Sequence, residues 1–592
     1  MIKIIRYFKW WYWILILIIV GFIYLQVSLD LLLPEYMNKI INYIGINYSS
    51  GIDQTSNILL EGLKMTGISF VSISATVVAS FIATRIGAAT AKEVRRAMYE
   101  KVNSFSMEEM EKFSTSSLIT RSTNDVQQVQ MVIIIALRMA ITAPIMATKA
   151  IIKIWGISSE MSFIVGIGIF GIIFLIGSIF VFALPKFKMI QKQIDQLNLV
   201  TRENLTGIRV VRAYNAEEFE QHKFEKANHD LTKTNLHVGY AMGLMMPGMQ
   251  LIMSGVNLAI VWFGAFLINK GTLGNNPIQG VALLMEFTTY ATHIVISFMF
   301  LTMMFIMMPR ASVSGKRIME VLDIGVKVKN PLRAVDMASR SEKGTIVFEN
   351  VSFRYPRAEA CVLNNISFQV KQGETIAFVG STGSGKSTLL NLVPRFYDVT
   401  EGKVLVDGID VRDYNQEDLH QLLGYVPQQG ILFRGDITSN IRFGQETITE
   451  EEINKALEIA QAMEFVEKLD EKLDYQIAQS GKNVSGGQKQ RLCIARAIAR
   501  KPEIYIFDDS FSALDYKTDY VLRRALKKET KSATNLIVAS RIGTILDADK
   551  IVVLEKGEIV GIGTHQELLK TCRVYQEMAT SQLSMEELNY AN

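Results

Sequence analysis

The stretch Gly380-Ser-Thr-Gly-Ser-Gly-Lys386-Ser387 decides the fold of the second half of this 592-residue chain. It matches the phosphate-binding pattern G-x-x-x-x-G-K-[ST] at every fixed position. The apolar run 375–379 before it is typical of a strand and 388–393 after it of a helix. Glycines at such a turn let backbone N–H groups surround phosphate oxygens, and the helix start adds partial positive charge. The pattern therefore predicts binding of a nucleoside triphosphate.

The side chains of this loop have separate expected roles. Lys386 would neutralise the β- and γ-phosphates, and the Ser387 hydroxyl would ligate Mg²⁺. The apolar run 504–507 predicts a buried strand that ends in Asp508, an acid suited to hold the hydrated Mg²⁺. The expected ATP-binding residues are Gly380, Ser381, Thr382, Gly383, Ser384, Gly385, Lys386, Ser387 and Thr388.

Apolar residues concentrate before residue 310, in runs long enough to cross a hydrocarbon core of roughly 30 Å. Two further candidates contain ionisable residues. We therefore predict six spanning helices. The charge-free runs are 10–29, 65–84, 161–185 and 234–269, and the two less clean candidates are about 130–155 and about 276–308.

Lysine and arginine crowd the segments 85–121 and 186–233, which would join these spans on one side. The segments expected on the other side of the membrane carry few lysine and arginine residues. By the positive-inside rule, both termini are expected in the cytoplasm of a multi-pass protein of the cell membrane, which we take to be bacterial.

Composition argues against other partners and cofactors. The net charge of +4 is small for this length, and cytoplasmic loops account for the basic residues, so no nucleic-acid partner is expected. Cys361, Cys493 and Cys572 lack metal-like spacing and are expected to be reduced structural thiols.

Ionisable and methionine side chains at membrane depth are candidates for a substrate pathway. Glu286 and His293 are seven residues apart and so share a face of the sixth span, and Lys149 of the third span could pair with Glu286. We favour structural pairing, or exposure to a water-filled cavity, over contact with substrate. Met303 and Met307 belong to a methionine-rich region that could repack around a small hydrophobic substrate, or could pack as ordinary core.

Further motifs follow the loop in order and resemble the ATP-binding cassette (ABC) superfamily, exporter type. The resemblance implies that Tyr355, expected to present an exposed ring, stacks on adenine, that Gln428 ligates Mg²⁺ and serves catalysis, and that Asp515 completes the D-loop. It also implies a signature that faces the γ-phosphate bound to an opposite subunit, formed by Ser485, Gly486, Gly487 and Gln488.

The same resemblance predicts the architecture. We expect an all-α transmembrane domain of six helices over 1–310, a connection over 311–343, and an α/β P-loop nucleotide-binding domain over 344–592. By composition the polar breaks 113–125 and 202–218 are solvated helical hairpins. In exporters of this type such breaks are coupling regions, which rest on the nucleotide domains.

The chain departs from the family pattern where water is activated. Asp509 stands where the family has a glutamate that acts as general base, and Ser540 stands where it has a γ-phosphate-sensing histidine. His420 and His565 are poorly placed in the sequence to substitute, and Gln479 replaces an acid before the signature. We therefore expect a site that binds ATP with Mg²⁺ but hydrolyses it slowly.

We interpret the chain as one half of a heterodimeric exporter resembling bacterial multidrug heterodimers. The expected partners are a second half-transporter that carries the missing glutamate and histidine, membrane lipid, and a small hydrophobic or amphipathic cargo. The alternatives are a homodimeric exporter of a peptide or lipid, import on the same fold, and a membrane protein that uses ATP as a regulatory ligand without transport.

Overall fold

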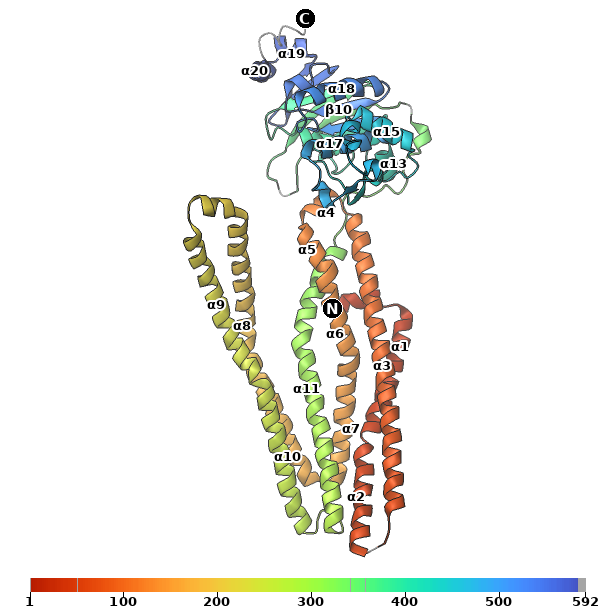
Figure 1. Ribbon diagram of the computed structural model, residues 1–592, viewed down its shortest axis with the longest axis vertical. Coiled ribbons are helices and arrows are strands. Elements are labelled where there is room, and N and C mark those ends of the chain that lie inside the picture. The colour runs from red at the N-terminus through yellow and green to blue at the C-terminus, as the bar shows by residue number, and fades with distance from the viewer. Residues whose placement is uncertain (1, 51, 341, 357, 584–592) are drawn as a thin grey trace. The chain divides into compact units, whose positions relative to one another are not determined.

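The computed structural model describes residues 2–50, 52–340, 342–356 and 358–583. The chain divides into two compact units (Figure 1). The first comprises Met1–Asn103 and Thr115–Ile324, and the second comprises Ser104–Ser114 and Gly325–Asn592.

The first unit is built from helices, several of them much longer than a bilayer requires. They are a 3-10 helix (Ile2–Tyr7), α1 (Trp10–Asp30), α2 (Leu33–Ser50), α3 (Thr55–Asn103), α5 (Thr115–Thr120), α6 (Val126–Ile135), α7 (Ile141–Ile157), α8 (Ser159–Ala213), α9 (Glu217–Gly243), α10 (Met245–Asn269) and α11 (Pro277–Leu322), with π-helical turns at Arg121–Asp125 and Ala136–Ala140.

Six helical segments of this unit are long and apolar enough to cross a membrane, which confirms the predicted number and includes the less clean third candidate. At 1.5 Å per residue the 55-residue α8 is about 80 Å long, well beyond a core of roughly 30 Å. α8 and α9 lie side by side as a long hairpin (Figure 1). The segments are Trp10–Asn47, Thr55–Asn103, Thr115–Ile157, Ser159–Ala213, Glu217–Asn269 and Pro277–Leu322.

The first span breaks at Leu31 and Leu32, two turn residues between α1 and α2. The Tyr290 hydroxyl of α11 donates to the Leu31 carbonyl at 2.9 Å. A helix break at membrane depth needs such a donor, because lipid cannot hydrogen-bond the backbone.

The second unit has the α/β architecture expected from the sequence. Its strands are β1 (Ile346–Phe353), β2 (Leu363–Val370), β3 (Thr375–Gly380), β4 (Glu401–Val406), β5 (Ile409–Asp410), β6 (Leu423–Val426), β7 (Gly435–Asp436), β8 (Gln476–Ile477), β9 (Ile504–Asp508), β10 (Thr534–Val538), β11 (Lys550–Glu555) and β12 (Glu558–Gly563). Its helices are α4 (Met107–Glu111), α12 (Lys386–Leu392), α13 (Gln416–Gln421), α14 (Ile437–Ile441), α15 (Glu450–Ile459), α16 (Met463–Val466), α17 (Gly486–Ala499), α18 (Tyr516–Glu529), α19 (His565–Thr571) and α20 (Arg573–Gln582). Short 3-10 turns lie at Met337–Ser339, Lys472–Asp474, Gln479–Gly481 and Ile542–Thr544.

The main sheet of this unit has the strand order β12-β11-β3-β10-β9-β6. All neighbours pair in parallel except β11 and β12. Every residue of β9 is buried, which explains its uninterrupted apolar run. A second, antiparallel sheet has the order β2-β1-β4-β5.

The two units differ from the expected domain limits in two places. Helix α11 continues to Leu322, so the first part of the segment expected as a connection is helical. Ser104–Ser114 belongs to the second unit, although α3 and α5 on either side of it in the chain belong to the first.

Candidate functional site

The candidate site lies at the carboxyl ends of four neighbouring parallel strands. The phosphate-binding loop follows β3, Ser540 follows β10, Asp508 and Asp509 close β9, and Gln428 follows β6. Because β3, β10, β9 and β6 are consecutive in the sheet, their ends meet at one edge.

The loop conformation depends on glycine. Gly380, Gly383 and Gly385 have φ of 154°, 84° and 98°, in a region that L side chains rarely adopt. A Cβ on Gly380 would lie 2.2 Å from the Leu554 carbonyl oxygen, and one on Gly385 would lie 2.7 Å from a Leu363 methyl group. Gly385 caps α12, so the loop delivers its N–H groups to a helix start as predicted.

Lys386 closes over its own loop. Its ammonium donates to the carbonyl oxygens of Gly380 and Ser381, both at 2.8 Å. Burial lowers the pKa of this ammonium, while the carboxylates of Asp509 and Asp508 act in the opposite direction. The positive charge therefore lies on the phosphate loop, within reach of the acids at the end of β9.

Ser387 and Asp508 form a pair suited to Mg²⁺. The Ser387 hydroxyl donates to Asp508 Oδ1 at 2.8 Å, and Asp508 is buried. Burial raises the pKa of the Asp508 carboxyl, against the lowering effect of the Ser387 hydrogen bond, so a cation beside it would be favourable. A hydroxyl and a carboxylate at a phosphate loop are oxygen ligands of the kind Mg²⁺ prefers, and the residues fit this metal.

Asp509 and Ser540, the two unusual residues, bond to each other. Asp509 Oδ1 accepts hydrogen bonds from the Ser540 hydroxyl at 2.5 Å and from the Ser540 backbone N–H at 3.2 Å. Asp509 itself has a φ of 46°. The carboxylate oxygen Oδ1 thus already accepts two hydrogen bonds from one neighbour.

Neither histidine of this unit replaces the missing one. His420 Nε2 is 2.8 Å from the Pro394 carbonyl oxygen. His565 is buried, with Nδ1 2.7 Å from the Tyr575 hydroxyl. Both rings are engaged with partners outside the site, in agreement with their positions in the sequence.

Gln428 is exposed two residues after β6. Val426 of β6 is in register with Phe507 of β9, so Gln428 lies beside the strand end that carries Asp508. This placement is compatible with its expected role near the metal.

Tyr355 differs from its expected exposure. It follows β1, its ring is partly buried, and its hydroxyl lies 2.9 Å from Thr388 Oγ1. The ring meets Phe353 and Tyr397 edge to face at centroid distances of 4.9 and 5.3 Å. It also lines a cavity of about 670 Å³. The expected exposed ring is therefore wrong, because two aromatic neighbours and Thr388 hold it against the protein.

The signature begins a helix as predicted. Ser485 caps α17, and its side chain and that of Gln488 exchange hydrogen bonds with each other's backbone N–H. Gly486 and Gly487 form the first turn. Asp515 caps α18 by accepting from the Thr518 N–H at 3.0 Å, a bond that lowers the pKa of its carboxyl.

One segment of the second unit was not predicted from the sequence. The first coupling stretch was expected at 113–125, but most of it, with Arg121 and Asp125, packs on α11 of the first unit. The segment joined to the nucleotide unit is Ser104–Ser114. Its helix α4 begins with a capping box of Ser106 and Glu109, which was the sequence signal available for it.

This segment is held by specific bonds within the second unit. The Tyr397 hydroxyl donates to Glu111 Oε1 at 2.6 Å, and Lys327 Nζ lies 2.8 Å from Glu108. Glu109 is buried and accepts from the Lys327 N–H at 3.3 Å. Burial and the bond to Glu111 raise the pKa of the Tyr397 phenol, so it donates as a neutral hydroxyl.

The second expected coupling stretch, 202–218, contains the end of α8, a turn at Tyr214–Ala216 and the start of α9. Leu205, Val210 and Tyr214 are 69%, 61% and 80% exposed. The tip of this hairpin therefore presents apolar surface.

The candidate substrate residues do not form one cluster. Glu286 is buried and accepts from Asn38 at 2.5 Å and from Tyr290 at 3.1 Å. Lys149 instead lies 3.5 Å from the centroid of the Tyr24 ring and donates to Ser28. The Lys149–Glu286 pair is therefore not formed, because each group is satisfied by a nearer partner.

Other pathway candidates are only partly buried. His293 is partly buried, Met303 is 47% exposed, and Met307 is partly buried. A methionine-containing cluster joins α8, α10 and α11, formed by Ile172, Met249 and Val295 with Met245, Met253 and Met299 packed against them.

Two family models match the chain. The ABC transporter transmembrane region matches residues 14–292, and the ABC transporter model matches residues 363–512. The chain is 38% identical to an uncharacterized ABC transporter ATP-binding protein of Mycobacterium tuberculosis, over 89% of this chain and 90% of that protein.

Relatives with named cargo are more distant. A multidrug resistance ABC transporter ATP-binding and permease protein of Lactococcus lactis is 28% identical over 94% of this chain and 91% of its own. An ATP-dependent lipid A-core flippase of Syntrophus aciditrophicus is 32% identical over 83% and 79%. The structure of a bacterial Atm1-family ABC exporter with ATP bound has the same fold, with a TM-score of 0.79 and 22% identity over 96% of this chain and 98% of that one.

Proposed function

Because this chain belongs to the ABC transporter family and is a half-transporter of the exporter type, we propose that it works in a heterodimer in which its own site binds ATP but hydrolyses it slowly. The observation that carries this proposal is the pair of hydrogen bonds from Ser540 to Asp509 Oδ1.

Two features would explain slow hydrolysis. A general base must be within about 2.6–3.2 Å of the water it deprotonates, and an aspartate is one methylene shorter than the usual glutamate. In addition, the two hydrogen bonds from Ser540 hold Asp509 Oδ1 toward β10, so this oxygen is already engaged with a neighbour. Losing a general base typically slows a reaction by about 10²–10⁴-fold.

Binding of ATP does not depend on these two residues. The N–H groups of the loop, the Lys386 ammonium and the start of α12 supply positive potential for phosphates. Ser387 and Asp508 would hold Mg²⁺, which neutralises charge on the phosphates when bound. The site therefore keeps its means of holding the nucleotide.

The signature supports a partner subunit. Ser485 begins α17 with an ordered capping box and glycines in the first turn, a geometry suited to phosphate oxygens. We propose that it completes a competent ATP site whose glutamate and histidine come from the second half-transporter. The exposed apolar tip of the α8–α9 hairpin offers a further surface for that subunit.

The proposed transport cycle follows from this division of ATP binding and ATP hydrolysis between the two subunits. ATP would hold both nucleotide units together, hydrolysis at the partner's site would separate them, and Ser104–Ser114 would pass the motion to α3 and α5, to which it is joined in the chain. We propose a hydrophobic or amphipathic cargo, because the methionine-containing cluster on α8, α10 and α11 can repack around varied apolar shapes.

The first test is the steady-state ATPase activity of this chain alone in lipid nanodiscs, with Lys386→Ala as the blank. We expect activity indistinguishable from the blank while ATP binding is retained. Robust turnover by the wild-type chain would contradict the proposal, and a homodimeric exporter would then be favoured.

A further inference from the structure

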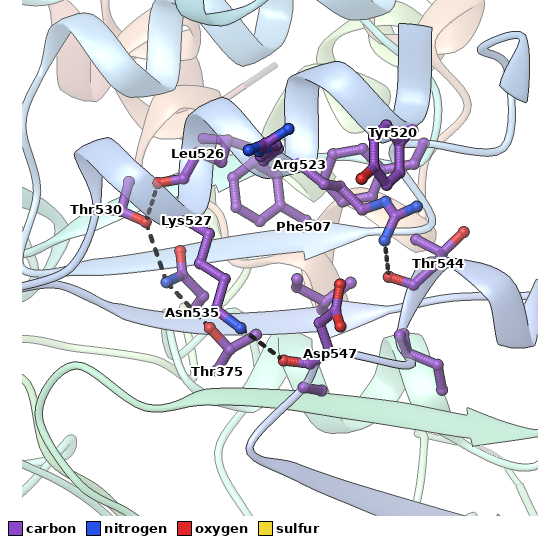
Figure 2. A pocket seen from close by; sticks show the side chains of 15 residues that line it. Thr375, Phe507, Tyr520, Arg523, Leu526, Lys527, Thr530, Asn535, Thr544 and Asp547 are labelled. Carbon is purple, nitrogen blue, oxygen red and sulfur yellow. Dashed lines mark hydrogen bonds between the residues drawn. The ribbon is translucent and has the colours of Figure 1, made fainter. Parts of the chain in front are cut away.

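A cavity of about 370 Å³ lies in the second unit between α18, the strands β3, β9 and β10, and the segment 544–548 (Figure 2). None of the phosphate-loop residues 380–388 lines it. Pockets that hold small organic molecules have volumes of about 300–1,000 Å³, and the volume of this cavity is near the lower end of that range.

The inner wall of this cavity is apolar. Phe507, Phe511, Leu526 and Ile545 line it and are all buried in the protein. Tyr520 also lines it but is 51% exposed, so its ring remains accessible to solvent. Figure 2 shows Phe507 and Tyr520 among the side chains that line the cavity.

The remaining lining is dominated by positive charge. Arg523, Arg524 and Lys527 all come from α18, and Asp547 is the acidic residue opposite them. Arg523 is fixed by bonds to Asp519 at 3.0 Å and to the Thr544 carbonyl at 2.9 Å. Lys527 donates to the Asp547 carbonyl at 3.2 Å (Figure 2).

Arg524 is different from its two neighbours. It is exposed, and it makes no hydrogen bond or ion pair with any residue in the described part of the chain. A guanidinium has five N–H donors in a planar fork that matches a carboxylate or sulfonate. Arg524 is therefore free to bind an anion that enters the cavity.

We propose that this cavity binds an amphipathic organic anion, namely an aromatic carboxylate or sulfonate of one or two rings. The ring would lie against the accessible ring of Tyr520, and the acid would face Arg524 and Lys527. The volume corresponds to about a dozen water molecules at roughly 30 Å³ each, which suits such a molecule.

A ligand here would affect the ATP site. Phe511 lies two residues after Asp509, and Thr544 lies four residues after Ser540. Because Phe511 and Thr544 both line the cavity, the cavity borders the two chain segments that carry Asp509 and Ser540. The Arg523 bond to the Thr544 carbonyl ties α18 to the second of them. Binding of the anion and of ATP should then alter each other's affinity by the same factor.

The test uses the full chain in lipid nanodiscs and 4-(trifluoromethyl)benzenesulfonate as the probe, followed by ¹⁹F NMR titration with empty nanodiscs as the blank. We expect saturable binding to the wild-type chain. Arg524→Glu should raise the Kd about tenfold or more, because it replaces a charge-assisted bond with repulsion.

Lys570→Glu is the matched control. Lys570 is exposed on another helix, α19, and its replacement changes the charge equally, but it does not line the cavity. We expect the Kd of this variant to stay within about twofold of wild type, because the substitution leaves Arg524 and the other lining residues unchanged. Absence of saturable binding to the wild type, or equal losses in both variants, would overturn the proposal.

A second measurement tests the link to the ATP site. A probe concentration that just saturates the wild type should shift the Kd for ATP in the wild type and in Lys570→Glu, and should shift it less in Arg524→Glu. An unchanged Kd for ATP in the wild type would refute the link. This experiment does not depend on whether the chain hydrolyses ATP alone.

Discussion

The nucleotide site has two halves at one edge of the sheet, one for phosphate binding and one for water activation. The two halves differ in the groups that form them. Around β3 and α12, phosphate binding relies on backbone N–H groups, a helix start, and the Ser387–Asp508 pair. Around β9 and β10, water activation would rely on two side chains, and here those side chains bond to each other.

This difference shows why binding and hydrolysis can be separated by substitution. Backbone donors are set by the path of the chain, so replacing a nearby side chain leaves them in place. A general base depends on the length and freedom of one carboxylate. We therefore propose that Asp509 and Ser540 impair the second half of the site and leave the first intact.

Restoring the second half should give the largest effect. The double variant Asp509→Glu with Ser540→His should raise the ATPase activity of the chain alone by about 100-fold or more, because it returns a base of the usual length and a phosphate-sensing ring. Steady-state ATPase in nanodiscs measures this. Adding Lys386→Ala should abolish the gain, and a double variant as inactive as wild type would show that more than these residues is missing.

The first half should be sensitive to loss of its metal ligand. Ser387→Ala should weaken ATP binding about tenfold in the presence of Mg²⁺, because a ligand oxygen beside Asp508 is lost. Isothermal titration with ATP measures the affinity. Ser387→Thr keeps the hydroxyl and should bind as wild type, and the Ala variant should match wild type in EDTA. Equal weakening with and without Mg²⁺ would mean that Ser387 acts on ATP directly.

The smallest effect concerns the segment Ser104–Ser114. Tyr397→Phe removes the bond to Glu111, whose carboxylate is exposed, so the loss should be about 1 kcal/mol. Hydrogen exchange of residues 104–114 should become faster while ATP affinity stays unchanged. Tyr355→Phe, which loses only the neutral contact with Thr388, is the control. Unchanged hydrogen exchange of residues 104–114 in Tyr397→Phe would mean that the contacts of Glu108 and Glu109 with Lys327 suffice to hold this segment.

Local structure of the site could be predicted from the sequence where it depends on neighbours in the chain. The loop from Gly380 to Ser387 and the strand ending in Asp508 were predicted correctly, since glycine spacing and an apolar run encode them directly. The six membrane spans were predicted for the same reason, because length and hydropathy are local.

Contacts between distant residues could not be predicted in this way. The bond between Ser540 and Asp509 depends on β10 lying beside β9, and the partial burial of Tyr355 depends on Tyr397. The placement of Ser104–Ser114 depends on Lys327 and Tyr397, more than 200 residues away. In the membrane unit, Glu286 accepts a hydrogen bond from Asn38 and forms no pair with Lys149, because helix packing decides which side chains meet.

The mutual contact of Asp509 and Ser540 also bears on how such a subunit could evolve. Each residue is the hydrogen-bond partner of the other, so replacing one alone leaves the other with a neighbour it does not match. In the heterodimer that we propose, recovery of full activity at this site would therefore require both residues to change.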